Sequence, residues 1–577
     1  MSWNNKGQSQ DPLIQAPYQK QGYQQSYQQP QPGYQQQYTQ NQSQYQYQQP
    51  QYAPPQQNYY QQQQQPPSQS QFAYGTDEEN RRNQNAKPVP PSNPPQFVQR
   101  PKFHDAWAAL LFALFIAGFV VMAYLGVPKV IDSLRTGVWE FPNGKGSQPA
   151  KTGTTTTGTN NTSASLATKD VFALLGCSVG AGLGFSIIYF FLMLNFPGPL
   201  ISFSYFFNVL LLLAAAGYAF QQGVLVMAII YLVFAVLVGL SYFWVRSRIP
   251  FSKLVLETVC RITAQFNGTL FVAFGGVVFS AAWSVLWLVT VLGMAQFASS
   301  KGLSDTVSII LLVVLVFINF WFSEVVRNTV HVAVCGTFAS YFFLGIQQPN
   351  SNKVTLPTNH TTASSLKRAL TTSFGSICFG SLLVSLIRTL KFIAQIARQD
   401  AAQDGNIICC LFATCLECIL SCMADILDFF NKYAYTEIAI YGKPYCDAGK
   451  DTWNLIKYKG IDLIINDCMI GQVLGMGSFF TALICAFAGW LYVHFNNGLG
   501  SLGNDVGVYI VTCLICAIIG AWLFLVLLEV VDSGTSATFV CLAEDPATIQ
   551  RTLPRLFAQV QERFPEVNWG MQSNAYH

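Results

Sequence analysis

The sequence has little charge. Asp, Glu, Lys and Arg make up 10% of its 577 residues, whereas they make up about 25% of an average soluble protein. Hydrophobic residues account for 51%, although residues 1–100 contain few aliphatic side chains. After residue 100 the chain divides into apolar runs of roughly 20 residues, each long enough to cross the ~30 Å hydrocarbon core of a bilayer. We therefore expect an all-α fold: a polytopic helical membrane protein with about ten transmembrane helices in the lipid bilayer.

The sequence also lacks the motifs of several function classes. No secretory signal peptide opens it, and it has no GxxxxGK[ST] motif for nucleotide binding, which argues against ATP-driven pumping. Only His331 among the five histidines lies deep in an apolar run, and no cluster of acidic metal ligands occurs. We expect no enzymatic activity, no cofactor, no bound metal and no nucleic-acid partner.

Cysteine occurs fifteen times, but its pattern does not indicate a disulfide framework. Most cysteines lie inside apolar runs, where the side chain behaves as a small hydrophobic residue. The cysteine cluster of the eighth span contains one CxxC, Cys415 and Cys418, with no second pair and no His in that span, whereas two such pairs or flanking histidines there would suggest zinc. We interpret the cysteines as helix-packing residues, with palmitoylation of Cys409 or Cys410 as the alternative.

Residues 1–100 are dominated by Gln, Tyr and Pro. Such a segment cannot bury enough apolar area to offset the conformational entropy that it would lose on folding. We expect a disordered cytosolic tail. Its Gln and Tyr bias is compatible with self-association or partner docking.

The apolar runs predict ten spans within a transmembrane domain over residues 101–546. They lie near 105–126, 171–193, 200–220, 223–245, 268–295, 305–328, 373–397, 407–428, 471–494 and 506–528. The sixth run continues past residue 340, so we expect a long, tilted or broken helix there. Residues 547–577 follow as a cytosolic C-terminal tail.

The distribution of Lys and Arg predicts the orientation of these spans. With a cytosolic N-terminus, the inner segments carry more Lys and Arg than the outer segments, even without the tail, as the positive-inside rule requires. Both termini are then cytosolic, and the first outer loop covers residues 127–170. This loop carries overlapping sequons at Asn160 and Asn161, which are candidate glycosylation sites on the predicted outer side.

Polar residues interrupt the sixth span and form the best candidate site. Glu324, Arg327, Asn328 and His331 are spaced i, i+3, i+4 and i+7, so they share one face of a helix. Charged residues in the bilayer centre cost a few kcal/mol and usually face the bundle interior or a water-filled path. The pattern favours a protein that moves a solute. The alternative is a structural pair of Glu324 with Arg327 or Asn328 inside the bundle.

Further candidates for substrate binding or coupling lie near this face and in the eighth span. Trp321 precedes Glu324 by three residues on the same side, and an aromatic face attracts a cation such as a quaternary ammonium. His331 can titrate near neutral pH and gate a proton. Glu417 lies deep in the eighth span, where it either hydrogen-bonds a neighbouring helix or takes part in a cation or proton path.

Glycines recur at helical spacing in the second span. Gly176, Gly180 and Gly184 are four residues apart, a small-xxx-small pattern that lets a neighbouring helix approach closely. We interpret them as helix-packing residues. The alternative is a surface that slides, or a hinge that bends, during alternating access.

Three stretches carry a resemblance to a known family. They are FWFSEVVRNTVHVAVCGTFASYFF in the sixth span, SSLKRALTTSFGSICFGSLLVSLIRTL over 364–390, and FFNKYAYTEIAIYGKPYCDAGKDTW over 429–453. In their order and spacing they resemble the choline transporter-like family, over about residue 100 to about residue 547. Tail and core together resemble its fungal branch. The residues that match its motifs are Asn328, His331, Gly336, Asn431, Tyr433, Tyr435 and Gly442.

The resemblance implies a ten-span carrier in the plasma membrane, with cytosolic termini and a large first outer loop. It also implies transport of choline or a related amine, with exchange of the organic cation for a proton. We therefore expect a secondary transporter of a small organic cation. Two other hypotheses remain open. One is a membrane enzyme in which Asn328 and His331 are catalytic, and the other is a non-transporting scaffold that recruits partners through the Gln-rich tail.

Overall fold

The computed structural model describes residues 102–136, 162–347, 354–357, 360–495 and 506–544, and parts of 548–561. The predicted disordered tail over 1–100 and the sequons at Asn160 and Asn161 lie outside the described residues. All described residues belong to one compact unit, Pro91–His577.

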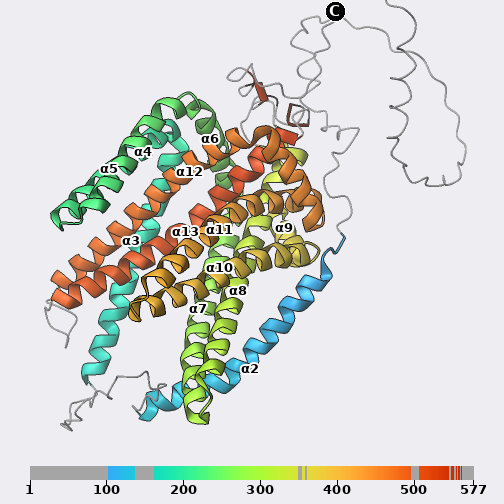
Figure 1. Ribbon diagram of the computed structural model, residues 1–577. Helices are drawn as coiled ribbons and strands as arrows, with labels where there is room; N and C mark the ends of the chain where they lie inside the picture. The colour runs from blue at the N-terminus through green and yellow to red at the C-terminus, as the bar shows by residue number, and fades with distance from the viewer. Residues whose placement is uncertain are drawn as a thin grey trace, which may run out of the picture. The chain divides into compact units, whose positions relative to one another are not determined.

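The fold is all-α, as the sequence predicts (Figure 1). Its helices are α2 (Ala106–Thr136), α3 (Thr162–Asn195), α4 (Pro197–Gln221), α5 (Leu225–Val245), α6 (Ile249–Gln265), α7 (Gly268–Lys301), α8 (Asp305–Leu344), α9 (Thr361–Leu370), α10 (Phe374–Gln403), α11 (Ile407–Tyr441), α12 (Tyr445–Phe495) and α13 (Val506–Glu544). Two short strands, β1 (Ile346–Gln347) and β2 (Val354–Thr355), pair antiparallel between α8 and α9.

Ten of the described helices, all except α6 and α9, are long and apolar enough to cross a membrane. This confirms the ten predicted spans. The sixth of them, α8, is one continuous helix of 40 residues, which confirms that the sixth apolar run forms a long helix. The shorter α6 is amphipathic, because Val255, Leu256 and Val259 are buried while Arg261 remains exposed.

Local sequence signals explain where α7, α8 and α11 begin or end. Ser304 caps α8 by accepting a hydrogen bond from the Val307 N–H, and Asn406 caps α11 in the same way. Such caps satisfy backbone donors that have no partner inside the helix. α7 ends at Gly302 and α11 ends at Gly442, with φ of 63° and 64°, in the left-handed region that glycine enters without a steric penalty.

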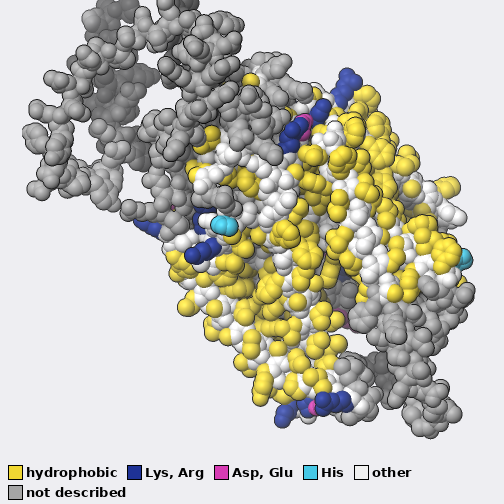
Figure 2. All heavy atoms as spheres, turned by 180° about the vertical axis from the view of Figure 1, so that it is seen from behind, with side chains coloured by type: hydrophobic (Ala, Val, Ile, Leu, Met, Phe, Trp, Pro, Cys, Tyr) yellow, Lys and Arg dark blue, Asp and Glu magenta, His cyan; other side chains and the backbone are white. Residues whose placement is uncertain are grey.

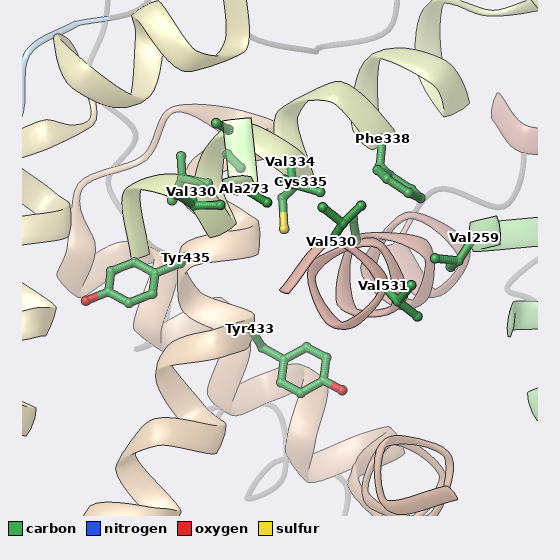
Figure 3. Close-up of a cluster of buried hydrophobic side chains, with 14 of the residues drawn as sticks. Val259, Ala273, Val330, Val334, Cys335, Phe338, Tyr433, Tyr435, Val530 and Val531 are labelled. Atoms are coloured by element: carbon green, nitrogen blue, oxygen red, sulfur yellow. The ribbon is translucent and has the colours of Figure 1, made fainter. Parts of the chain in front are cut away.

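The C-terminal half of α8 lies in the core of the bundle, packed against α10, α11 and α13. Figure 3 shows Cys335 and Phe338 of α8 on the side of Val530 of α13, and all three side chains are buried. In a membrane, such contacts stabilise the fold through close packing, because lipid tails are as apolar as the side chains. This packing fixes the face of α8 that carries the candidate site.

The outer surface of the bundle is hydrophobic, as contact with lipid requires. Figure 2 shows hydrophobic side chains over the body of the helices, with Lys and Arg gathered toward the borders of this surface. On α11 the large exposed apolar residues run from Ile407 to Ile426, and on α13 they run from Val506 to Leu525. Both helices continue beyond these residues. The lipid-facing band of each helix therefore ends before the helix does.

The glycine stripe of α3 does not make the predicted close helix contact. A Cβ added at Gly176, Gly180 or Gly184 would have no described neighbouring atom within 4 Å. The contact is made at Gly182, where a Cβ would lie 2.8 Å from Leu523 of α13. Residues two positions apart on a helix point about 200° apart, so the real contact falls on the side opposite the stripe.

Candidate functional site

A cavity of about 290 Å³ lies between α8, α11, α12 and α13. Its volume is close to the lower end of small-molecule sites, which span about 300–1,000 Å³. All of its lining residues except Phe429 are polar or charged. They are Glu324, Arg327, Asn328, His331, Asp428, Phe429, Asn431, Lys432, Asp467, Glu529 and Asp532. The cavity thus brings together three of the sequence-predicted candidates, Glu324, Asn328 and His331.

Glu324 is held by side chains from two helices. Its side chain is only 3% exposed. Its Oε2 accepts hydrogen bonds from Arg327 Nη2 at 2.7 Å and from Asn328 Nδ2 at 3.5 Å, so the structural pairs considered from the sequence are present. Its Oε1 accepts a hydrogen bond from Arg388 of α10. A buried carboxylate needs such partners, because an unpaired buried charge is costly.

Arg388 extends this pair into a network that joins α8, α10 and α11. Its Nη2 donates to Asp428 Oδ2 at 2.7 Å while its Nη1 bonds to Glu324. Arg327 lies 3.7 Å from the other oxygen of Asp428. Two guanidinium groups therefore balance two carboxylates at one side of the cavity, and a guanidinium fork suits such bridging.

Lys432 forms a second network that joins α11, α12 and α13. Its Nζ donates to Asp467 Oδ1 at 2.5 Å and to Asp532 Oδ1 at 2.6 Å. The lysine side chain is 12% exposed, and that of Asp532 is 35% exposed. Short hydrogen bonds between charged groups are about twice as strong as neutral ones, so Lys432 fixes the relative positions of these three helices.

His331 is anchored at the inner wall of the cavity. Its Nε2 lies 2.9 Å from the backbone oxygen of Lys432, and its Nδ1 lies 2.8 Å from Ser533 Oγ. The carbonyl can only accept, so Nε2 carries the hydrogen and donates it. In the neutral ring, Nδ1 then accepts from the Ser533 hydroxyl. These two bonds fix both the tautomer and the orientation of the imidazole.

The charges around the cavity do not balance. Five carboxylates line it, from Glu324, Asp428, Asp467, Glu529 and Asp532. Only Arg327 and Lys432 line it with positive charge, and Arg388 reaches in from α10. A cleft with an excess of one sign concentrates counter-ions of the other sign. The arrangement therefore suits a bound cation better than a bound anion.

The structure places two of the predicted candidates away from the cavity lining. Trp321 is 1% exposed, its ring packs 5.2 Å from that of Phe112, and its Nε1 donates to the Cys378 backbone oxygen at 3.1 Å. Glu417 is paired with Arg398 at 3.1 Å and accepts a hydrogen bond from Gln395. The aromatic wall of the cavity is Phe429.

The residues that match family motifs mostly shape the surroundings of the cavity. Asn431 lines the cavity. Its Oδ1 accepts a hydrogen bond from the Tyr445 hydroxyl at 2.5 Å, and its Nδ2 donates one to the Gly380 backbone oxygen at 3.3 Å. Tyr435 Oη lies 3.3 Å from Ser381 Oγ, and Tyr433 is fully buried. Gly336 faces α9, where a Cβ would lie 2.7 Å from Arg368, and Gly442 is the left-handed residue that ends α11.

Apart from Asn431, which matches a family motif, sequence reasoning missed the cavity residues on α11, α12 and α13. The missed charged residues are Asp428, Lys432, Asp467, Glu529 and Asp532. Their spacing was a usable signal: Asp428 and Lys432 are four apart, and Glu529 and Asp532 are three apart. Each pair therefore shares a helix face.

Comparison with known proteins identifies one family of membrane transporters and several fungal relatives. A family model described as "Plasma-membrane choline transporter" matches residues 229–547, a range that contains every residue lining the cavity. Protein PNS1 of Mycosarcoma maydis is 32% identical over 483 residues, which cover 82% of this chain and 85% of that protein. Protein PNS1 of Candida albicans is 32% identical over 485 residues, covering 82% and 88%. Protein PNS1 of Neurospora crassa is 31% identical, covering 82% of both chains.

Proposed function

The chain belongs to the plasma-membrane choline transporter family, and from this premise we propose that it is a secondary transporter of choline or another small organic cation. In this proposal the protein resides in the plasma membrane with both termini in the cytosol, and a proton is the exchanged ion. The observation that carries the proposal is the acidic excess in a cavity of small-molecule size between four helices.

The cavity also has features that suit an amine substrate. An organic cation needs compensating negative charge when it leaves water, and the five carboxylates supply it. Phe429 offers an aromatic face, which attracts a cation by about 0.5–2 kcal/mol depending on desolvation. Asn328 and Asn431 add neutral polar groups that can orient a substrate hydroxyl.

The position of the cavity supports access from the cytosolic side. Asp428 and Lys432 follow the lipid-facing band of α11, and Glu529 and Asp532 follow that of α13. In the predicted orientation these ends of both helices point toward the cytosol. Transport then requires a movement that opens the cavity to the other side. The Arg388 and Lys432 networks connect the helices that line the cavity, so such a movement changes these contacts.

The proposal predicts saturable amine uptake by the purified protein. In proteoliposomes with an acidic interior, labelled choline should enter faster than without a pH gradient, because outward proton movement drives inward amine movement. An ionophore that dissipates the gradient is the matched control, and protein-free vesicles measure leakage. Uptake that ignores the gradient would contradict proton exchange. Absence of uptake across a panel of small amines, with folded protein, would contradict transport and favour the scaffold hypothesis.

A further inference from the structure

One carboxylate of the cavity differs from the other four. Glu324 and Asp428 are paired with Arg388, and Asp467 and Asp532 are paired with Lys432. Glu529 also lines the cavity, but no hydrogen bond or ion pair joins its carboxylate to any residue that the structure describes. Its side chain is half-buried in the middle of α13.

The nearby positive charges are already committed to other carboxylates. The charged groups that act on Glu529 electrostatically are Arg327, Asp532, Lys432 and Glu324. Arg327 donates to Glu324 at 2.7 Å, and Lys432 bonds to Asp467 and Asp532. The other titratable groups that line the cavity are His331, Asp428 and Asp467. α3, α6 and α7 also pack against α13 but contribute no lining residue.

An isolated carboxylate in such a place is costly, so it takes up a cation or a proton. A substrate cation can bind there without breaking either existing network. Resting on the proposed transport function, we propose that Glu529 is the carboxylate that binds the substrate ammonium, and that a proton replaces the substrate there when the site is empty. The site then carries the same net charge in both states.

The exchange balances as a simple proton transfer. In the empty site, Glu529 is a neutral carboxylic acid. When the organic cation arrives, the O–H bond breaks, the proton leaves to the water in the cavity, and the carboxylate pairs with the cation. On release to the other side, a proton from the water there binds the carboxylate. One amine therefore moves against one proton.

The inference predicts a specific loss in Glu529→Gln. Removal of the charge-assisted contact between the carboxylate and the ammonium should weaken choline binding by roughly 10- to 100-fold. The dissociation constant is measured by calorimetry on the full-length protein in detergent. The residual uptake at high choline concentration should no longer respond to a pH gradient. Glu529→Asp should recover part of the choline affinity and part of the response of uptake to the pH gradient. Because Glu529 has no ion-pair partner among the described residues, the Gln variant should keep the thermal unfolding midpoint of the wild type.

Glu257→Gln is the matched control, since it makes the same change at a carboxylate outside the cavity that pairs with Arg261 on α6. It should bind and transport choline like the wild type. If Glu529→Gln binds choline with unchanged affinity and keeps gradient-dependent uptake, the assignment of Glu529 is wrong while the transport function stands. If the wild-type protein binds and moves no amine in the panel, the proposed function is wrong and the assignment falls with it.

Discussion

Lys432→Met is expected to destabilise the protein by about 3–5 kcal/mol, because it leaves two carboxylates in the bundle without their shared cation. Lys432 holds Asp467 and Asp532 on two other helices at 2.5 and 2.6 Å. Met has a similar length, so the change removes charge and hydrogen bonds more than volume. Asp532 is 35% exposed, and solvent screening of this group places the expected cost toward the lower end.

The measurement is thermal unfolding of the purified full-length variant in detergent, with the folded fraction followed by size-exclusion chromatography after heating. Lys432→Met combined with Asp467→Asn should recover part of the lost stability, since one uncompensated carboxylate is removed. Lys450→Met is the matched control, because Lys450 pairs with Asp447 at an exposed position. An unchanged unfolding midpoint in Lys432→Met would show that the Lys432 network does not hold these helices together.

Arg388→Met should have an effect of similar size for a related reason. Arg388 bonds to both Glu324 and Asp428, and the Glu324 side chain is 3% exposed. After the substitution, Arg327 alone would balance two carboxylates, and a broken buried pair typically costs about 3–5 kcal/mol. The same variant should also lose choline uptake, because the wall of the cavity that α8 and α11 form is no longer fixed.

A double-mutant cycle with Glu324→Gln separates the pair from its surroundings. The double variant should be more stable than the sum of the two single changes predicts, with a coupling of roughly 0.5–3 kcal/mol, as for residues in one ion-pair network. The readout is the unfolding midpoint of all four proteins under one set of conditions. Strictly additive changes would mean that the contact between Arg388 and Glu324 contributes nothing to stability.

The sequence was sufficient for the fold class and the number of spans. Apolar runs of about 20 residues mark transmembrane helices directly, since the bilayer leaves few alternatives for the backbone. The same reasoning found the polar face of α8, because Glu324, Asn328 and His331 stand out against an otherwise apolar run. Local composition decides both features, so neither depends on knowing which helices are neighbours.

The remaining cavity residues were missed because hydropathy predicts spans that are shorter than the helices themselves. The eighth span was expected to end at 428 and the tenth at 528, and the ninth was expected to begin at 471. In the structure, α11 continues to Tyr441, α13 continues to Glu544 and α12 begins at Tyr445. Lys432, Asp467 and Glu529 therefore lie just outside the predicted spans, where charged residues are common and do not stand out.

Helix neighbours decide the other differences. Trp321 has the right spacing to lie on the same helix face as Glu324. However, its ring packs against Phe112 of α2 and its indole N–H donates to a backbone oxygen of α10. Glu417 has a partner in Arg398 across the α10–α11 hairpin. The glycine stripe of α3 satisfies a packing motif, yet α13 approaches the opposite side at Gly182. The spacing of residues along one helix therefore does not predict which of its faces packs against a neighbouring helix.

The most direct test of the transport site is a structure of the full-length protein in a lipid nanodisc with saturating choline, determined by electron cryo-microscopy. The account predicts ligand density in the cavity between α8, α11, α12 and α13, with the ammonium beside Glu529 and the Lys432 and Arg388 pairs still in place. Density for the ligand elsewhere in the bundle, such as beside Trp321 or Glu417, with the cavity filled only by water, would contradict it.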